Sequence, residues 1–371
     1  MDDAAGEIII DLGAIRCNFR RLKRHLAESS ELAAVVKANA YGLGAERVVP
    51  VLADEGCRIF FVTTTKEAVV VRGVCKNCTI YVFNGITGSG DWKLYSADRG
   101  MRPVLNDLNQ VDQWIRLGGA DELAVAIQLD TGMTRYGVSK TQLLSLKKRL
   151  NGRVVPSLLM SHLACADDEE HWLNSAQLKQ FREFVDILGL GQNSGCPLSL
   201  ANSSGLFLGE DYHFAMVRAG AALYGINPQP GKPNKMAGVL QLRAKATQVR
   251  FVDSPTTVGY GATHHVNLRT RIATVPVGYA DGFLRALGGR ASAYVGDTRV
   301  PVVGRVSMDA ITLDISGVPE AVDVEAESVE IIGPRRPVDV VASEAGTIGY
   351  ELLARISHRQ RRVYIDEVGR L

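Results

Sequence analysis

Lys37 ends an apolar run, Ala34–Val36, and is followed by Ala38-Asn39-Ala40-Tyr41-Gly42. Lysine is depleted from strand interiors and is seldom buried without a partner. Lys37 is therefore either a solvated residue at the edge of a sheet or a chemical group. A desolvated lysine has a lowered pKa and can form a Schiff base with an aldehyde, so Lys37 is the first candidate for chemistry.

Other polar residues that could do chemistry also follow apolar runs of strand length. They are Gln128 with Asp130 to Arg135, Ser161 with His162, Asn202 to Gly205, and Arg218 to Ala221. Each alone has an ordinary explanation: a satisfied core histidine, a helix cap, an ion pair between Asp130 and Arg135, or a solvated arginine. At the same ends of successive strands they predict one pocket. The small residues around Ser203 and Gly220 would suit a phosphate there.

The elements that must position these residues repeat along the first 230 or so positions. Helix-length stretches such as Ala45–Glu55 and Ser175–Leu188 separate apolar runs at Ala33–Val36, Ile59–Thr63, Thr79–Phe83, Arg102–Leu105, Ala124–Leu129, Ser157–Met160, Leu198–Leu200 and Phe214–Val217. Roughly eight such repeats predict an α/β fold, a (β/α)8 TIM-like barrel with its active site at the carboxyl ends of the strands. An open doubly wound sheet is the alternative, but no Gly-x-Gly-x-x-Gly opens a helix after the first strand.

The pattern changes at Pro228–Asn234, whose composition is typical of a linker. Downstream, strand-like runs with glycine-rich turns predict a mostly antiparallel β domain, in which Val338–Ile356 is the main helical segment. We therefore predict a barrel over residues 11–234 and a β domain over residues 235–371, with an N-terminal strand in residues 1–10 packing on the β domain. The predicted strands are Leu240–Val252, Arg271–Val277, Ser292–Val295, Val300–Val303, Ala310–Ile315, Ser328–Ile332 and Arg362–Ile365.

Composition excludes several classes of protein. Apolar content is 46%, charged content 22% and net charge +2, so no basic surface for nucleic acid or an anionic membrane is expected. The acidic start, Met1–Glu7, does not resemble a secretory signal, and six scattered cysteines are typical of a reduced compartment, so we expect a cytoplasmic protein. Cys75 and Cys78 have metal or redox spacing, but no second pair or nearby histidine completes a site, and no metal is predicted.

With these residues assembled, the sequence resembles alanine racemase, a barrel-type enzyme that depends on pyridoxal 5'-phosphate (PLP). The resemblance covers essentially the whole chain, in order. Its motifs are Val36–Gly44, Asp130–Met133 with Arg135, Ser161–Ala164, Ala201–Ser203, Val217–Gly220 with Leu223–Gly225, Val258–Gly261, Pro276–Gly282, Gly304–Asp309 and Tyr350-Glu351.

The resemblance implies a role for each candidate. Lys37 would hold PLP as a Schiff base, and Arg218 would face the pyridine nitrogen. His162 would stack near the ring and link Arg218 with Tyr260, while Arg135 would contact the cofactor's phenolic oxygen and the substrate carboxylate. The remaining cofactor contacts, mostly to the phosphate, would come from Tyr41, Asn202, Ser203, Gly220, Ala221 and Tyr350.

The resemblance also implies a head-to-tail homodimer. Tyr260, Tyr279, Met308 and Asp309 would reach the site from the partner chain, with the last three near the substrate. Racemisation removes the Cα proton from one face and returns one to the other, so two bases on opposite faces need not move. Lys37 would serve one face and Tyr260 the other, its phenolate stabilised against the ordinary tyrosine pKa of ~10 by a nearby imidazole and guanidinium.

The chain departs from the family at Gln128, where a lysine, commonly carbamylated, often holds the arginine corresponding to Arg135. Glutamine cannot form a carbamate, but its carbonyl can accept one hydrogen bond from Arg135. We therefore expect Arg135 to be held by Gln128 with a small anion such as chloride, or by a rearranged Asp130.

Alternatives to alanine remain open at the sequence level. A racemase of serine or another small amino acid is the closest, because packing at the pocket mouth sets substrate size. A barrel-type PLP decarboxylase is disfavoured, since those enzymes place an acid, not an arginine, at the pyridine nitrogen. A non-catalytic PLP carrier would have no use for the second domain. In the leading interpretation, the enzyme supplies D-alanine for peptidoglycan or consumes it in catabolism.

Overall fold

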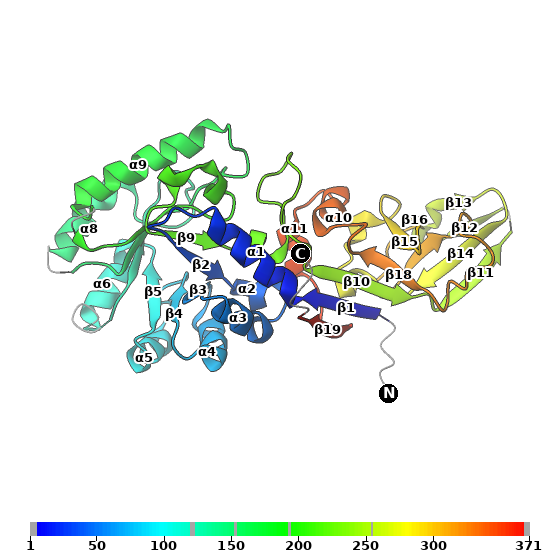
Figure 1. Ribbon diagram of the computed structural model, residues 1–371, viewed down its shortest axis with the longest axis horizontal. Helices are drawn as coiled ribbons and strands as arrows, with labels where there is room; N and C mark the ends of the chain where they lie inside the picture. Colours follow the sequence, from blue (N-terminus) through cyan, green and yellow to red (C-terminus); the bar gives the residue numbers. More distant parts are fainter. Residues whose placement is uncertain (1–5, 119–122, 152–153, 192–193, 254, 367–371) are drawn as a thin grey trace.

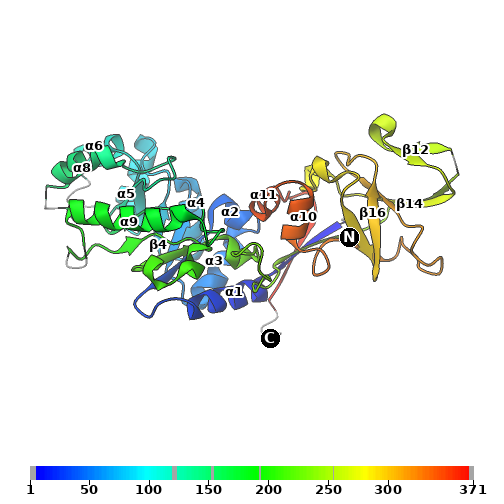
Figure 2. The ribbon, with the colours of Figure 1, turned by 90° about the horizontal axis from the view of Figure 1, so that it is seen from above.

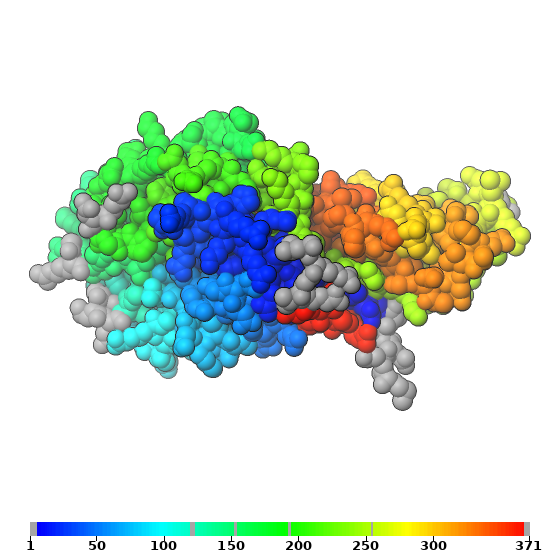
Figure 3. All heavy atoms as spheres, viewed as in Figure 1, coloured from blue at the N-terminus to red at the C-terminus, as the bar shows by residue number. Residues whose placement is uncertain are grey.

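Two domains lie along the longest axis of the molecule (Figure 1). The computed structural model describes residues 6–118, 123–151, 154–191, 194–253 and 255–366. The first five residues of the predicted N-terminal strand and acidic start lie outside this set. Figure 3 shows the second domain as a narrower lobe beside the barrel.

The first domain is the predicted barrel. Eight parallel strands lie in the order β8-β7-β6-β5-β4-β3-β2-β9. Between β8 and β9, the amide of Arg218 donates to Ala201 O at 3.0 Å, so the sheet nearly closes on itself. The strands are β2 (Glu31–Val35), β3 (Ile59–Val62), β4 (Thr79–Val82), β5 (Met101–Leu105), β6 (Ala126–Gln128), β7 (Leu158–Met160), β8 (Leu198–Ser199) and β9 (Met216–Ala219).

Helices surround this sheet (Figures 1 and 2). Polar residues begin several of them: Asp11 accepts from Ala14 N at 2.8 Å before α1, and Thr64 forms a capping box before α4. The helices are α1 (Leu12–Arg24), α3 (Ala45–Asp54), α4 (Thr65–Val74), α5 (Ser89–Ala97), α6 (Leu108–Arg116), α8 (Leu143–Leu150) and α9 (Trp172–Leu188).

The second domain is built on a nine-stranded sheet, in the order β11-β14-β17-β16-β15-β18-β10-β1-β19. The N-terminal strand β1 (Gly6–Asp11) pairs with β10 (Leu240–Lys245) and runs parallel to β19 (Arg361–Ile365), whereas the other pairs are antiparallel. The other strands are β11 (Gln248–Val252), β14 (Thr270–Val275), β15 (Ser292–Val295), β16 (Thr298–Val303), β17 (Ile311–Asp314) and β18 (Ser328–Ile332).

Three sequence-based assignments in this domain need correction. The run Leu240–Val252 is two strands, β10 and β11, because the chain leaves one position in the sheet and re-enters at its edge. The predicted helix Val338–Ile356 is two helices, α10 (Val338–Glu344) and α11 (Gly349–Ala354), since Gly346 between them has φ 72°. A hairpin of β12 (Thr256–Val258) and β13 (His264–Val266) was not anticipated, and it carries Tyr260.

Candidate active site

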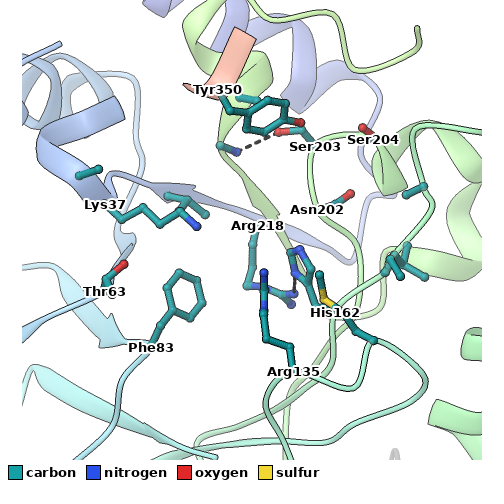
Figure 4. A pocket seen from close by; sticks show the side chains of 18 of the residues that line it. Lys37, Thr63, Phe83, Arg135, His162, Asn202, Ser203, Ser204, Arg218 and Tyr350 are labelled. Atoms are coloured by element: carbon teal, nitrogen blue, oxygen red, sulfur yellow. Dashed lines mark hydrogen bonds between the residues drawn. The ribbon is translucent and has the colours of Figure 1, made fainter. Parts of the chain in front are cut away.

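A cavity of about 740 Å³ lies at the carboxyl ends of the barrel strands (Figure 4). Ten predicted site residues line it, and nine come from the barrel while Tyr350 comes from α11 of the second domain. The barrel residues are Lys37, Tyr41, Arg135, His162, Asn202, Ser203, Arg218, Gly220 and Ala221. The structure thus gathers the strand-end residues into one pocket, while their individual roles stay predictions.

The chain after Lys37 forms a left-handed helical turn, within a short segment labelled α2 (Lys37–Tyr41). Ala38, Asn39 and Ala40 have φ of 51°, 56° and 54°, and the positive φ continues through Tyr41 to Gly42. A left-handed conformation costs a non-glycine residue roughly 1–2 kcal/mol, and such strain tends to occur at functional sites. The sequence does not predict this turn, because glycine, the residue that favours a left-handed conformation, occurs only at its end.

Contacts from both domains hold the turn. Within it, Gly42 N donates to Ala38 O at 2.7 Å, and Asn39 Oδ1 accepts from Ala45 N at 2.8 Å. From the second domain, Arg362 donates to Gly42 O at 2.6 Å. Lys37 is therefore attached to a constrained backbone rather than to a loose loop.

Burial lowers the pKa of Lys37, and the positive charge of Arg135 lowers it further. The Nζ atom lies 5.8 Å from the centroid of the Phe83 ring. Phe83 is a cavity residue that the sequence analysis did not single out. Burial and Arg135 thus increase the share of the neutral amine, which is the form that attacks a carbonyl carbon or accepts a proton.

The buried Arg218 and the half-buried His162 form a pair beside Lys37 (Figure 4). Arg218 is 2% exposed and donates to Ser199 Oγ at 2.5 Å, Ser161 O at 2.6 Å and His162 Nδ1 at 3.2 Å. Burial lowers the pKa of Arg218 to about 9, so it stays protonated at neutral pH. Sequence reasoning missed Ser199 because a serine inside a short strand carries no distinctive signal.

The pair also sets the state of the imidazole. Burial lowers the pKa of His162 to about 3, with Arg218, Arg135 and Lys37 adding to the effect, so the ring is neutral at physiological pH. A guanidinium can only donate, so Nδ1 must accept and the ring proton must lie on Nε2. His162 can therefore donate from Nε2 to a group in the cavity.

The other end of the cavity has the features of a phosphate site. Ser203 Oγ accepts from Gly220 N at 2.9 Å and Ala222 N at 3.3 Å, which leaves its own hydrogen to donate. A Cβ on Gly220 would lie 2.5 Å from Tyr41 Oη, so only glycine admits the tyrosine here. Tyr350 lies near Ser203 (Figure 4), and its ring centroid is 6.2 Å from that of Tyr41. Asn202 lines the cavity, but its Oδ1 accepts from Gly205 N at 2.9 Å, as a turn cap would.

The structure shows no hydrogen bond from Arg135 to Gln128 or Asp130, and support of Arg135 by an anion stays a prediction. Asp130 Oδ1 accepts from the amides of Gly132, Met133 and Thr134 at 3.0–3.1 Å and so orders its own loop. Gln128 Nε2 lies 3.5 Å from Tyr136 O, at the limit of a hydrogen bond. Among the described residues, neither side chain bonds to Arg135, which extends into the cavity towards His162 (Figure 4).

The four residues predicted to serve the partner's site are not in the cavity of their own chain. Tyr260, Tyr279 and Met308 are 72%, 41% and 52% exposed on the second domain. Tyr260 lies between β12 and β13, in a hairpin at the end of the second domain away from the barrel (Figure 1). The loops of Tyr279 and Met308 are joined, because Ala280 N donates to Met308 O at 3.0 Å; Asp309 pairs with Arg359 at 2.7 Å.

No helix in the described ranges has the length and hydropathy needed to cross a membrane. Nor do those ranges contain three or more His, Cys, Asp or Glu side chains grouped to bind a metal. Cys78 Sγ donates to Cys75 O at 3.0 Å, so this pair is engaged with the backbone.

Comparison with known proteins agrees with the geometry. The family described as "Alanine racemase, N-terminal domain" matches residues 10–228, and "Alanine racemase, C-terminal domain" matches residues 239–364. A catabolic alanine racemase of Agrobacterium fabrum is 42% identical over 98% of this chain and 93% of its own length. An alanine racemase of Brucella abortus is 41% identical over 98% of this chain and 95% of its own.

Solved structures give the same result. The Bartonella henselae alanine racemase, solved with covalently bound pyridoxal phosphate, has a TM-score of 0.91 and 35% identity, covering 98% of this chain and 100% of that one. The biosynthetic alanine racemase of Pseudomonas aeruginosa has a TM-score of 0.89 and 35% identity, covering 98% and 99%.

Proposed function

Because the chain belongs to the alanine racemase family and interconverts L- and D-alanine with PLP, we propose that Lys37 and the partner subunit's tyrosine equivalent to Tyr260 are its two bases. The observation that carries this proposal is the environment of Lys37. Its pKa is lowered, its backbone is constrained, and it shares one cavity with Arg135, His162 and Arg218.

The cavity fits PLP on the chemistry of its own groups. The hydroxyl of Ser203, the phenol of Tyr41 and that of Tyr350 would hold the phosphate, and the absence of a Cβ on Gly220 leaves room for the Tyr41 phenol there. The buried Arg218 would face the pyridine nitrogen, and Lys37 would be the point of covalent attachment. When bound, PLP supplies the electron sink that makes the substrate Cα proton acidic.

Arg218 would also restrict the chemistry to proton transfer. It is held by four acceptors and stays protonated at neutral pH, so it cannot take a proton from a pyridinium and disfavours one electrostatically. A weaker electron sink limits transamination and decarboxylation. The remaining cation, Arg135, would bind the substrate carboxylate. Arg135 is free to do so, because no carboxylate among the described residues pairs with it.

Tyr260 would act in the site of a second copy. It is 72% exposed, and it lies at the far end of its own chain from the barrel cavity (Figure 1). A head-to-tail homodimer would bring this residue, with Tyr279, Met308 and Asp309, over the partner's cavity mouth. There the Nε2 proton of His162 would hydrogen-bond to the phenolic oxygen and stabilise it as a base.

We place the enzyme in the cytoplasm, where D-alanine would be made for peptidoglycan or enter catabolism. Fractionation of the native cells, and growth of a deletion strain with and without D-alanine, would separate these roles. A requirement for D-alanine would favour the biosynthetic one.

The decisive experiment for the bases uses isotopes: purified protein with PLP is incubated in deuterated water with L-alanine or D-alanine, and replacement of the Cα proton by deuterium is followed for each enantiomer. Loss of optical activity with L-alanine, L-serine and L-lysine is followed separately and tests the substrate range. Tyr260→Phe is expected to slow proton removal from L-alanine more than from D-alanine, and Lys37→Ala to abolish covalent cofactor attachment. Equal slowing of both directions by Tyr260→Phe would reject the assignment of faces, and a Lys37→Ala protein that still attaches PLP would reject Lys37.

A further inference from the structure

We infer that Glu67 is a positioning residue for Lys37: its carboxylate holds the start of the left-handed turn and so fixes where the lysine side chain begins. The inference rests on the proposed role of Lys37. Glu67 lies on α4, outside the residues that line the cavity, and does not belong to the motifs that identified the family.

The Glu67 carboxylate joins the ends of two neighbouring barrel strands. Its Oε1 accepts from Ala38 N at 2.7 Å, just after Lys37. Its Oε2 accepts from Thr63 N at 2.7 Å and Thr64 N at 3.1 Å, at the end of β3. A capping box accounts for the Thr64 contact alone. The contact with Ala38 is additional and ties the helix cap to the lysine segment.

The first N–H groups of a helical turn have no partner within the turn. Further along this turn, Ala40 N donates to Val36 O at 2.9 Å and Gly42 N to Ala38 O at 2.7 Å. The amide of Ala38 has no such partner upstream, and the Glu67 carboxylate takes that place. A bond to a charged acceptor is stronger than one to a neutral acceptor, which suits a backbone held in an unfavourable conformation.

Glu67 also balances the charge around Lys37. The described charged groups that face Lys37 are Arg135 and Glu67, with the neutral His162 nearby. Arg135 lowers the pKa of Lys37, whereas Glu67 raises it. Loss of the carboxylate should therefore move the lysine and lower its pKa together.

Glu67→Gln tests the inference with little change in shape. A glutamine has one acceptor oxygen, so it cannot serve Ala38 and the two threonine amides as the carboxylate does. Thr64→Ala is the matched control, because it removes the Thr64 Oγ1 bond to Glu67 N in the same capping box and leaves the Ala38 contact intact. Glu67→Asp keeps the charge on a shorter side chain, and so distinguishes the effect of the charge from that of the hydrogen bond to Ala38.

Three measurements report on Lys37. In the apoprotein, the pH dependence of Lys37 acetylation, followed by peptide mass spectrometry, gives its pKa. In the PLP-loaded enzyme, the visible band of the bound cofactor is titrated with pH. The primary isotope effect with Cα-deuterated alanine is measured in both directions.

For Glu67→Gln we expect a lower Lys37 pKa and a shifted cofactor titration. We also expect kcat to fall about 10- to 100-fold, with the isotope effect rising only for the enantiomer that Lys37 deprotonates. Glu67→Asp should keep most of the Lys37 pKa and lose part of kcat. Thr64→Ala should lower thermal stability and leave all three Lys37 readouts at wild-type values.

Two results would overturn the inference. One is an unchanged Lys37 titration and isotope effect in Glu67→Gln; the other is an equal change in Thr64→Ala. Borohydride reduction of the wild-type holoenzyme, with mapping of the labelled lysine, tests the proposed function separately. If the label is on Lys37 while Glu67→Gln behaves as wild type, only the positioning role fails.

Discussion

At the residue scale, the site depends on groups whose protonation state is set by their neighbours. The guanidinium of Arg218 fixes the tautomer of His162 by donating to Nδ1 at 3.2 Å. Neither the contact nor the tautomer can be read from the sequence, in which Arg218 and His162 are simply polar residues at the ends of strands. The contact makes the imidazole a donor towards the cavity rather than a further cation beside Arg218 and Arg135.

The neutral His162 predicts a pH dependence of stability. Its pKa is lowered to about 3 in the fold and returns to ~6.5 on unfolding, so protons bind the unfolded chain preferentially between these values. The stabilisation is complete above pH ~6.5 and is lost as pH falls towards 3, at up to about 1.4 kcal/mol per unit. Denaturant unfolding of the apoprotein from pH 7.5 to 4.5 measures the slope.

His162→Gln should flatten this slope, since glutamine does not titrate. Exposed histidines offer controls, and His25→Gln is the simplest choice because His25 is exposed at the carboxyl end of α1. An unchanged slope in His162→Gln would contradict the assignment.

Gly220 predicts a specific loss of cofactor affinity. A Cβ there would lie 2.5 Å from Tyr41 Oη and must displace the phenol from the proposed phosphate site. Gly220→Ala should raise the Kd for PLP about 10- to 100-fold, equivalent to about 1.4–2.8 kcal/mol. Fluorescence titration of the apoprotein with PLP measures it. Gly73→Ala, where a Cβ would meet nothing within 4 Å, is the control and should bind PLP normally.

At the scale of elements, the left-handed turn after Lys37 is a place where the second domain contacts the barrel. Arg362 of β19 donates to Gly42 O, and the Tyr364 hydroxyl donates to Leu43 O at 3.0 Å. The helix α11 packs closely against the same turn: a Cβ on Gly42 would lie only 2.4 Å from Leu353 O. The second domain therefore supports the lysine segment of its own chain.

Gly42→Ala tests this packing. The residue has φ 82° and no room for a Cβ, so both backbone strain and a clash should lower the unfolding free energy, by about 3 kcal/mol in all. Gly56→Ala is the matched control: it has φ 93°, but its Cβ would meet only Lys23 Nζ at 3.9 Å, so about 1 kcal/mol is expected. Equal decreases in unfolding free energy in the two variants would show that α11 moves away from the added methyl group without destabilising the fold.

At the scale of the whole molecule, the cavity lies in the barrel beside α11, whereas Tyr260 is exposed on the β12–β13 hairpin, which lies at the far end of the second domain (Figures 1 and 2). A single chain therefore cannot supply both proposed bases to one cavity without a large rearrangement. Exposed aromatic and methionine side chains on joined loops are also what a subunit interface uses.

Subunit mixing tests the proposed dimer. Lys37→Ala and Tyr260→Phe chains should each be nearly inactive alone. After they are unfolded and refolded together, half of the dimers are mixed, and each mixed dimer has one complete site if Tyr260 acts across the interface. Activity should recover to about one quarter of wild type. No recovery, in a sample that light scattering shows to be dimeric, would place both bases in one chain.

The sequence by itself determined the fold class, the family and the strand ends at which the cavity lies. Local apolar periodicity is enough to place the barrel strands, and the fold then brings their carboxyl ends together. The same reasoning singled out Lys37, Arg135, His162 and Arg218, because polar residues at buried strand ends are costly without a use.

Only the tertiary structure decided what depends on contacts between distant segments. It separated Leu240–Val252 into two strands. It also showed that Asp130 bonds to amides of its own loop instead of Arg135, and that Glu67 contacts the turn after Lys37. Sheet order, hydrogen-bond partners and a left-handed backbone arise from the competition of all neighbours for each group. A local pattern does not contain that information, because the neighbours are distant in the chain.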